Sequence, residues 1–257
     1  MSAEHRFSRL DLLVGKEGLA RLGSASVAVF GVGGVGSYAV EALARGGVGR
    51  LTLVDFDDIC LTNVNRQLHA LEGTIGRAKV QVMAERCRAI NPKLQVEPIK
   101  AFYAADNAAE LLDRGYDYVL DCIDHITAKL HLLQSCTERG LPVISSMGAA
   151  NKLDPTQVKV ADLAHTRTCR LARIIRKELR RRGIPGGIRV VYSTEEFRPL
   201  SPAAAVCADN CICPNQQDQA WRCTDRRVIL GSSSVIPPLF GLTMAGEVLR
   251  ALLGEAG

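Results

Sequence analysis

The chain has 257 residues, of which 47% are apolar and 23% charged, and its formal net charge is +5. This composition is ordinary for a globular protein, and the length allows a substantial hydrophobic core. The nine cysteines are scattered through helix-like and strand-like segments, which argues against a disulfide framework and for a reducing cytoplasm. The N-terminal residues MSAEHRFSRL lack an apolar signal core, so a cytoplasmic location is expected.

Short apolar segments alternate with segments of helical periodicity, which predicts βαβ units. Strands are expected at residues 27–30, 51–54, 94–99, 118–123 and 142–145. Helices are expected at residues 37–45, 79–90 and 127–139. The predicted fold class is α/β, with a Rossmann-like doubly wound, mostly parallel sheet and C-terminal extension strands and helices.

The pattern changes after about residue 150. Two further strands, at 157–161 and 188–193, are expected around a basic helix at 167–182, and a Cys-rich loop follows at 200–227. We expect one domain, 1–257, made of a nucleotide-binding core part, 20–165, and a C-terminal part, 166–257.

An apolar stretch near the C-terminus predicts a buried core helix that begins after Pro237 and Pro238. The uninterrupted part of this stretch, residues 239–246, is too short to span a bilayer. No membrane partner is therefore expected.

A glycine-rich loop, Gly31-Val32-Gly33-Gly34-Val35-Gly36, follows the first predicted strand and opens a helix. Glycines at these positions allow a tight turn and let backbone N–H groups approach phosphate oxygens. Asp55 ends the next strand, where its carboxylate can accept hydrogen bonds from ribose hydroxyls. The combination predicts a nucleotide site.

Polar residues beyond the second strand distinguish ATP from NAD. Asn63-Val64-Asn65-Arg66-Gln67 follow an acidic cluster, and Lys79 comes after a turn that contains glycine. NAD carries only a pyrophosphate, whereas Arg66 and Lys79 suit the β- and γ-phosphates of ATP and a pentavalent α-phosphate. ATP is the favoured nucleotide.

Residues 6–162 resemble the adenylating domain of the ubiquitin-activating-enzyme-like superfamily, which includes the molybdopterin-synthase and thiamine-pathway adenylyltransferases. The shared features are the glycine loop, Asp55, the N-x-x-R-Q motif, Lys79 and a D-x-x-D motif formed by Asp121 and Asp124. The resemblance implies that ATP adenylates a carboxylate, which gives an acyl-AMP and pyrophosphate.

The resemblance also implies roles for single residues. Arg66 and Lys79 neutralise charge as pyrophosphate leaves, and Asp124 positions Mg²⁺ and the α-phosphate. Arg9, in the R-F-S-R segment, reaches the ATP of a partner subunit and so implies a homodimer. The expected catalytic residues are Arg66, Lys79, Asp124 and Arg9. The expected nucleotide site comprises Gly31, Gly33, Gly34, Gly36, Asp55, Asp57, Asn65, Arg66, Gln67, Lys79 and Asp124.

The segment 165–189 holds nine Arg or Lys residues against one Glu. Leu171, Ile175 and Leu179 are expected to form its buried stripe. A charge run of this kind is either a solvated helix face or a footprint for a phosphate backbone. The predicted tRNA-contacting residues are Arg173, Arg176, Arg180 and Arg181.

The late cysteines bear on the substrate. Adenylyltransferases that act on sulfur-carrier proteins usually hold zinc with two C-x-x-C pairs, and this sequence contains no C-x-x-C. The four late cysteines instead have the spacing C-x₃-C-x-C-x₉-C, which leaves loop thiols and a metal site both open. They are Cys207, Cys211, Cys213 and Cys223.

Three C-terminal segments resemble the tRNA threonylcarbamoyladenosine dehydratase branch of the superfamily: VISSMGAANKLDPTQVKVADLAHT, the RVVYSTEE segment at 189–196, and SSSVIPPLFGLTMAGEVLR. Many relatives have Asp-Pro where Cys169-Arg170 stand here. This branch implies that the carboxylate of the modified adenosine is adenylated and that its own ureido group closes a ring and expels AMP. No enzyme nucleophile is required, because a tethered nucleophile has a high effective molarity.

Three alternatives stay open. One is activation of the C-terminal glycine of a sulfur-carrier protein, with a cysteine desulfurase or a sulfur acceptor as partner. Another is an NAD-dependent oxidoreductase, which leaves Arg66, Lys79 and Asp124 unexplained. The third is a nucleotide sensor without turnover.

Overall fold

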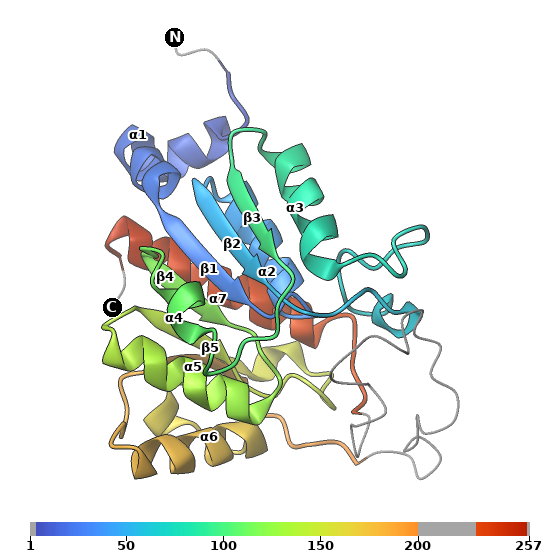
Figure 1. Ribbon diagram of the computed structural model, residues 1–257, viewed down its shortest axis with the longest axis vertical. Helices are drawn as coiled ribbons and strands as arrows, with labels where there is room; N and C mark the ends of the chain where they lie inside the picture. The colour runs from blue at the N-terminus through green and yellow to red at the C-terminus, as the bar shows by residue number, and fades with distance from the viewer. Residues whose placement is uncertain (1–3, 200–229, 256–257) are drawn as a thin grey trace.

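The computed structural model describes residues 4–199 and 230–255. These residues contain a seven-stranded sheet, and its strands are arranged in the order β3-β2-β1-β4-β5-β7-β6. Figure 1 labels β1 to β5. Only β6 runs antiparallel to its neighbour among the described strands. The strands are β1 (Ser26–Phe30), β2 (Arg50–Val54), β3 (Gln95–Ile99), β4 (Tyr118–Asp121), β5 (Val143–Ser146), β6 (Val158–Asp162) and β7 (Arg189–Ser193). The predicted mostly parallel α/β fold is confirmed.

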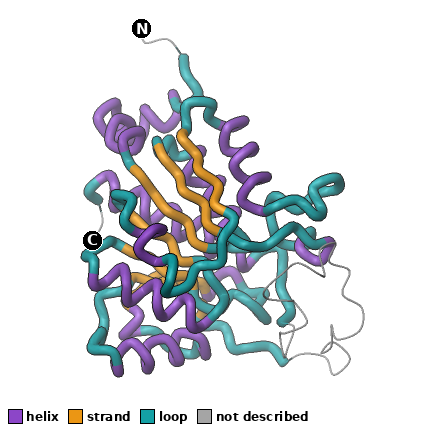
Figure 2. Tube along the Cα trace, in the orientation of Figure 1, coloured by secondary structure: helices purple, strands orange, loops and turns teal. Residues whose placement is uncertain are grey.

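Helices cover both faces of the sheet (Figure 2). They are α1 (Ser8–Ser24), α2 (Gly36–Arg45), α3 (Lys79–Ile90), α4 (Ala108–Leu112), α5 (Ile126–Glu138), α6 (Arg170–Arg181) and α7 (Ile236–Leu253). Val27 and Val29 of β1 join the core with α2, α3 and α7, whereas Ala28 and Phe30 join the core with α4 and α5. The alternation follows from the two-residue period of a strand, and burial on both faces explains why β1 is apolar throughout.

The strand order reverses at β1. This strand pairs in parallel with β2 on one side, where Phe30 lies opposite Val54, and with β4 on the other, where Phe30 lies opposite Asp121. A reversal of this kind leaves a crevice at the carboxyl ends of the strands, which is where parallel α/β sheets bind ligands.

The start of α7 was predicted wrongly. The helix begins at Ile236, so Pro237 lies in its first turn, where a backbone N–H has no intrahelical partner to lose. The complete helix is long and apolar enough to cross a membrane by length and composition, so the argument from shortness was also wrong. It is nevertheless a core helix, as expected, because Phe240 and Met244 are fully buried and Gly241 packs directly against α2.

The basic helix α6 packs on α5 through a stripe that differs slightly from the prediction. Ile175 and Leu179 are fully buried, as expected, but Leu171 is only half-buried and Ala172 takes the buried position. Spacings of three and four residues place Ala172, Ile175 and Leu179 on one face of a helix. The cationic side chains therefore occupy the remaining faces.

Candidate active site

The glycine loop turns tightly between β1 and α2. Gly31 has a φ of +88°, and a Cβ there would lie 2.8 Å from the Cys122 carbonyl group; a Cβ at Gly36 would lie 1.9 Å from the Gly31 oxygen. These two glycines are therefore demanded by the fold itself. Gly33 is different, since the nearest atom to its Cβ position is a Gln67 nitrogen at 3.8 Å. Its backbone has room around it, as a ligand-approaching position requires.

Asp55 secures this loop from the end of β2. One carboxylate oxygen accepts a hydrogen bond from the Val32 N–H at 2.6 Å, and the other accepts from the Asp57 N–H at 2.8 Å. Asp55 is 8% exposed, and burial raises the pKa of its carboxyl group. The carboxylate predicted to hold ribose thus also fixes the backbone of the glycine loop.

Lys79, the first residue of α3, joins the acidic cluster. Its Nζ donates to Asp57 Oδ2 at 2.6 Å, and its side chain is 6% exposed. Burial alone would lower the pKa of Lys79, but the negative charges of Asp55, Asp57 and Asp124 outweigh burial and raise it. Lys79 is therefore a buried cation at the carboxyl edge of the sheet.

A buried histidine beside Lys79 has no counterpart in the sequence prediction. His69 is 1% exposed, and neither ring nitrogen has a hydrogen-bond partner among residues 4–199 and 230–255. Burial, together with the positive charge of Lys79, lowers the pKa of His69 to about 3. The imidazole is therefore neutral at physiological pH. No local sequence motif predicts that His69 is buried at this site.

Arg66 lies against the glycine loop. A Cβ at Gly34 would be 3.3 Å from Arg66 Cγ. The guanidinium donates to the Thr62 carbonyl oxygen at 3.1 Å and to Asn65 Oδ1 at 3.0 Å, and Asn65 Nδ2 donates in turn to the Ser232 carbonyl oxygen at 3.2 Å. The structure thus brings Asn65 and Arg66 to the loop, together with the buried side chain of Gln67.

The two acids of the D-x-x-D motif have different environments. Asp121 is fully buried, and its carboxylate accepts from Lys129 Nζ at 2.5 Å, from Ser145 Oγ at 2.6 Å and from the Ile123 N–H at 3.1 Å. Asp124 is exposed in the segment between β4 and α5. Asp121 therefore anchors the segment that carries Asp124, and Asp124 is the exposed carboxylate of the two.

The described part of the chain brings no three His, Cys, Asp or Glu side chains into a metal-binding cluster. Burial raises the pKa of the Cys122 thiol and raises that of Cys136 to about 12. Both thiols are protonated at neutral pH and are therefore poor nucleophiles. The Cys-rich loop, with Cys207, Cys211, Cys213 and Cys223, lies outside the described residues.

Arg9 is exposed near the start of α1, away from the glycine loop of its own chain. The residues just before it lie at the amino edge of the sheet, because Arg6 donates to the Ile90 carbonyl oxygen and the Phe7 ring lies beside Gly47. The structure therefore does not bring Arg9 together with Arg66 and Lys79.

The cations of α6 divide into two kinds. Arg173, Arg180 and Arg181 are exposed, although Arg181 pairs with Glu178 at 2.9 Å. Arg176 is half-buried, and its guanidinium donates to the carbonyl oxygen of Thr166 at 2.7 Å and to its hydroxyl at 2.6 Å. Arg176 thus anchors the loop before α6, while the other three form the outer basic surface.

Residues 7–257 match the ThiF family. This chain belongs to the ThiF family. It is 45% identical to the tRNA threonylcarbamoyladenosine dehydratase of Bacillus subtilis, over 98% of this chain and 96% of that protein. The crystal structure of the Escherichia coli tRNA N6-threonylcarbamoyladenosine dehydratase in complex with ATP superimposes with a TM-score of 0.83 at 35% identity, covering 97% of this chain and 94% of that one.

Another ThiF-type relative is similar over a shorter length. The molybdopterin-synthase adenylyltransferase of Salmonella typhimurium is 36% identical over 58% of this chain and 59% of its own length. Similarity to the dehydratases therefore covers nearly the whole of this ThiF-family chain, whereas similarity to the adenylyltransferase covers little more than half of it. The resemblance identified in the sequence is confirmed.

Proposed function

We propose that this ThiF-family protein is an ATP-dependent tRNA threonylcarbamoyladenosine dehydratase of the cytoplasm. The observation that carries the proposal is nearly full-length similarity to proteins of that name, over 98% of this chain and 96% of the Bacillus subtilis protein. The cluster of Arg66, Lys79 and the glycine loop at the carboxyl edge of the sheet supports ATP as the co-substrate.

The chemistry proceeds in two balanced steps. A carboxylate oxygen of the threonylcarbamoyl group attacks the α-phosphorus of ATP, and the bond to the β-phosphate oxygen breaks, which gives an acyl-AMP and pyrophosphate. The ureido group then attacks the activated carbonyl, loses a proton and expels AMP. The oxygen lost by the substrate leaves with AMP, so the net reaction is dehydration driven by ATP.

The residues of the site suit the first step. Charge accumulates on the leaving pyrophosphate, and Arg66 and Lys79 supply fixed positive charge beside the phosphate loop. The raised pKa of Lys79 keeps its ammonium charged, with Asp57 as its partner. Both cations therefore act by binding and neutralising phosphate oxygens.

Asp124 would hold Mg²⁺ at this site. Magnesium commonly takes one or two protein carboxylates and completes its coordination with waters and substrate phosphates, so a single exposed aspartate fits it. When bound, the ion would supply charge neutralisation on the phosphates. Asp121 and Lys129 would keep the Asp124 segment in place beneath it.

Substrate and subunit contacts complete the proposal. Arg173, Arg180 and Arg181 form a basic surface suited to tRNA phosphates. On α1, Leu12 and Leu13 are 84% and 80% exposed beside Arg9, and such neighbouring apolar side chains support a homodimer in which Arg9 reaches the partner's ATP.

A pyrophosphate-release assay tests the function. We expect release with tRNA that carries threonylcarbamoyladenosine and none with unmodified tRNA or a sulfur-carrier protein. Release that depends on a sulfur-carrier protein would favour the adenylyltransferase alternative. ATP binding without release on any of these substrates would favour a nucleotide sensor.

A further inference from the structure

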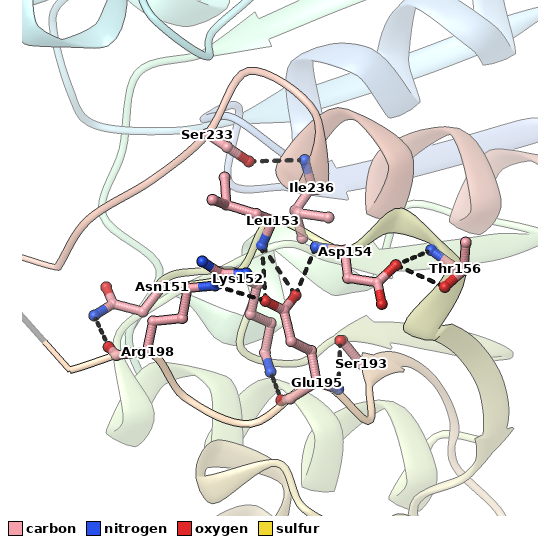
Figure 3. Close-up of polar contacts among 10 residues, drawn as sticks. All are labelled: Asn151, Lys152, Leu153, Asp154, Thr156, Ser193, Glu195, Arg198, Ser233 and Ile236. Atoms are coloured by element: carbon pink, nitrogen blue, oxygen red, sulfur yellow. Dashed lines mark hydrogen bonds and ion pairs between the residues drawn. The ribbon is translucent and has the colours of Figure 1, made fainter.

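Two segments that lie far apart in the sequence are joined by hydrogen bonds (Figure 3). The carboxylate of Glu195 accepts hydrogen bonds from the backbone N–H groups of Leu153 and Asp154 at 2.9 and 2.8 Å. The buried ammonium of Lys152 donates to the carbonyl oxygen of Glu195. Residues 151–154 and 195–198, named here the clasp, therefore form one hydrogen-bonded unit.

Asn151 is the centre of the clasp. Its φ of +56° lies in the left-handed region, where asparagine is among the better tolerated residues, and it is 7% exposed. Its Nδ2 donates to the Arg198 carbonyl oxygen at 2.8 Å, and its own carbonyl oxygen accepts from the Arg198 N–H at 3.1 Å. Its backbone N–H points in another direction and donates to the Gly231 carbonyl oxygen at 2.9 Å.

The hydrogen bond from Asn151 to Gly231 connects the clasp to the active site. The next residue, Ser232, accepts a hydrogen bond from Asn65 Nδ2 on its carbonyl oxygen. This bond turns the other end of the amide, Oδ1, toward the Arg66 guanidinium. The amide directs its nitrogen to Ser232 and its oxygen to Arg66, so the position of residues 231–232 determines where one acceptor of the Arg66 guanidinium lies; the Thr62 carbonyl oxygen is another.

We propose that Asn151 is a positioning residue for Arg66, acting through Gly231, Ser232 and the side-chain amide of Asn65. The inference rests on the proposed function, in which Arg66 binds the outer phosphates of ATP. A guanidinium held by a fixed acceptor has less rotational freedom to lose when ATP binds, so the clasp strengthens the contact without touching the nucleotide.

Direct titration with ATP and with AMP tests the inference. AMP lacks the β- and γ-phosphates, so loss of Arg66 positioning weakens ATP binding and leaves AMP binding unchanged. We expect Asn65→Ala and Asn151→Ala each to weaken ATP affinity by about tenfold, a typical coupling within one network. Thr156→Ala, which removes an exposed contact to Asp154 in the same region, is the matched control and should bind both nucleotides normally.

A double-mutant cycle decides whether the two asparagines share a path. If Asn151 acts through Asn65, the ATP affinity of the double variant should equal, within about twofold, that of the single variant with the lower ATP affinity. If the losses of ATP affinity in the two single variants multiply in the double variant, the positioning role is overturned. An equal loss of ATP and AMP affinity in Asn151→Ala would overturn it as well. Asn151→Asp is the second variant, because aspartate also accepts the left-handed conformation but cannot donate to Arg198; unchanged ATP affinity in it would likewise count against the role.

The outcome is separable from that of the proposed function. Nucleotide titration needs no tRNA, so the cycle reads Arg66 positioning even if the protein releases no pyrophosphate with modified tRNA. Conversely, the wild type could dehydrate modified tRNA while the two losses of ATP affinity multiply in the double variant. The proposed function would then stand, and only the positioning role of Asn151 would be wrong.

Discussion

The ammonium of Lys79 is hydrogen-bonded to the carboxylate of Asp57 at 2.6 Å, and the lysine side chain is almost completely buried. Asp57 is in turn held by Asp55, which also binds the glycine loop. The main buried cation of the site is thus connected to the phosphate loop through two carboxylates. ATP phosphates that contact Lys79 would meet an ammonium group that is already hydrogen-bonded to Asp57.

Arg66→Ala and Lys79→Ala should each reduce the rate of pyrophosphate release on the order of 10²-fold, as expected for loss of a contact to transition-state charge. Pyrophosphate release at saturating modified tRNA measures the effect, and circular dichroism confirms that each variant is folded. Near-normal turnover in either folded variant would remove that residue from the mechanism.

Asp124→Asn should retain ATP binding and lose turnover that depends on Mg²⁺, since the amide is a much weaker magnesium ligand than the carboxylate. The assay is pyrophosphate release across a magnesium titration, alongside ATP titration. Asp106→Asn offers a control at another exposed aspartate and should behave as wild type. An unchanged magnesium dependence in Asp124→Asn would assign the ion to another group.

Acid should destabilise the fold through His69. Its folded-state pKa of about 3 lies below the ordinary value of 6.5, so the unfolded chain binds the proton more tightly and stability falls as the pH drops from 6.5 toward 3. At pH 5 the loss relative to neutral pH is about 2 kcal/mol from this group. Urea unfolding at pH 7 and pH 5 should show that His69→Leu loses correspondingly less stability than wild type; an equal loss in both would contradict the assignment.

Lys129→Met should destabilise the fold by about 3–5 kcal/mol, because it leaves the buried carboxylate of Asp121 without its cation. Replacing both partners, as Asp121→Leu with Lys129→Met, should recover part of that loss, since no unpaired charge then remains buried. Urea unfolding measures both variants. A double variant less stable than Lys129→Met would show that the pair contributes more than mutual neutralisation.

Reversing Arg173 and Arg180 to Glu should raise the KM for tRNA and flatten the salt dependence of tRNA binding, because fewer counterions are released. The KM for ATP should stay nearly constant, since neither residue contacts the glycine loop. Arg176→Ala is the contrasting variant, expected to lower thermal stability through its lost Thr166 bonds while tRNA affinity changes little. Unchanged tRNA affinity in a folded double reversal would make α6 simply a solvated face.

Local sequence was sufficient for the sheet and for much of the nucleotide site. Fully buried parallel strands are short apolar runs, and α3 occupies the predicted residues 79–90 because its apolar spacing is strictly helical. The glycine loop comes directly after β1, and Asp55 and Arg66 come after β2, so they lie close together because these two strands are neighbours.

Tertiary structure alone decided which polar groups are buried and what they contact. Asp121 and Asp124 share one motif, yet only Asp121 meets Lys129 and Ser145, which reach it from α5 and β5. Arg176 has the same charge as its neighbours on α6, but Thr166 lies within its reach. The clasp likewise depends on contacts between distant segments. Desolvation and hydrogen bonding are set by whatever packs against a group, and for these residues those partners come from elsewhere in the chain.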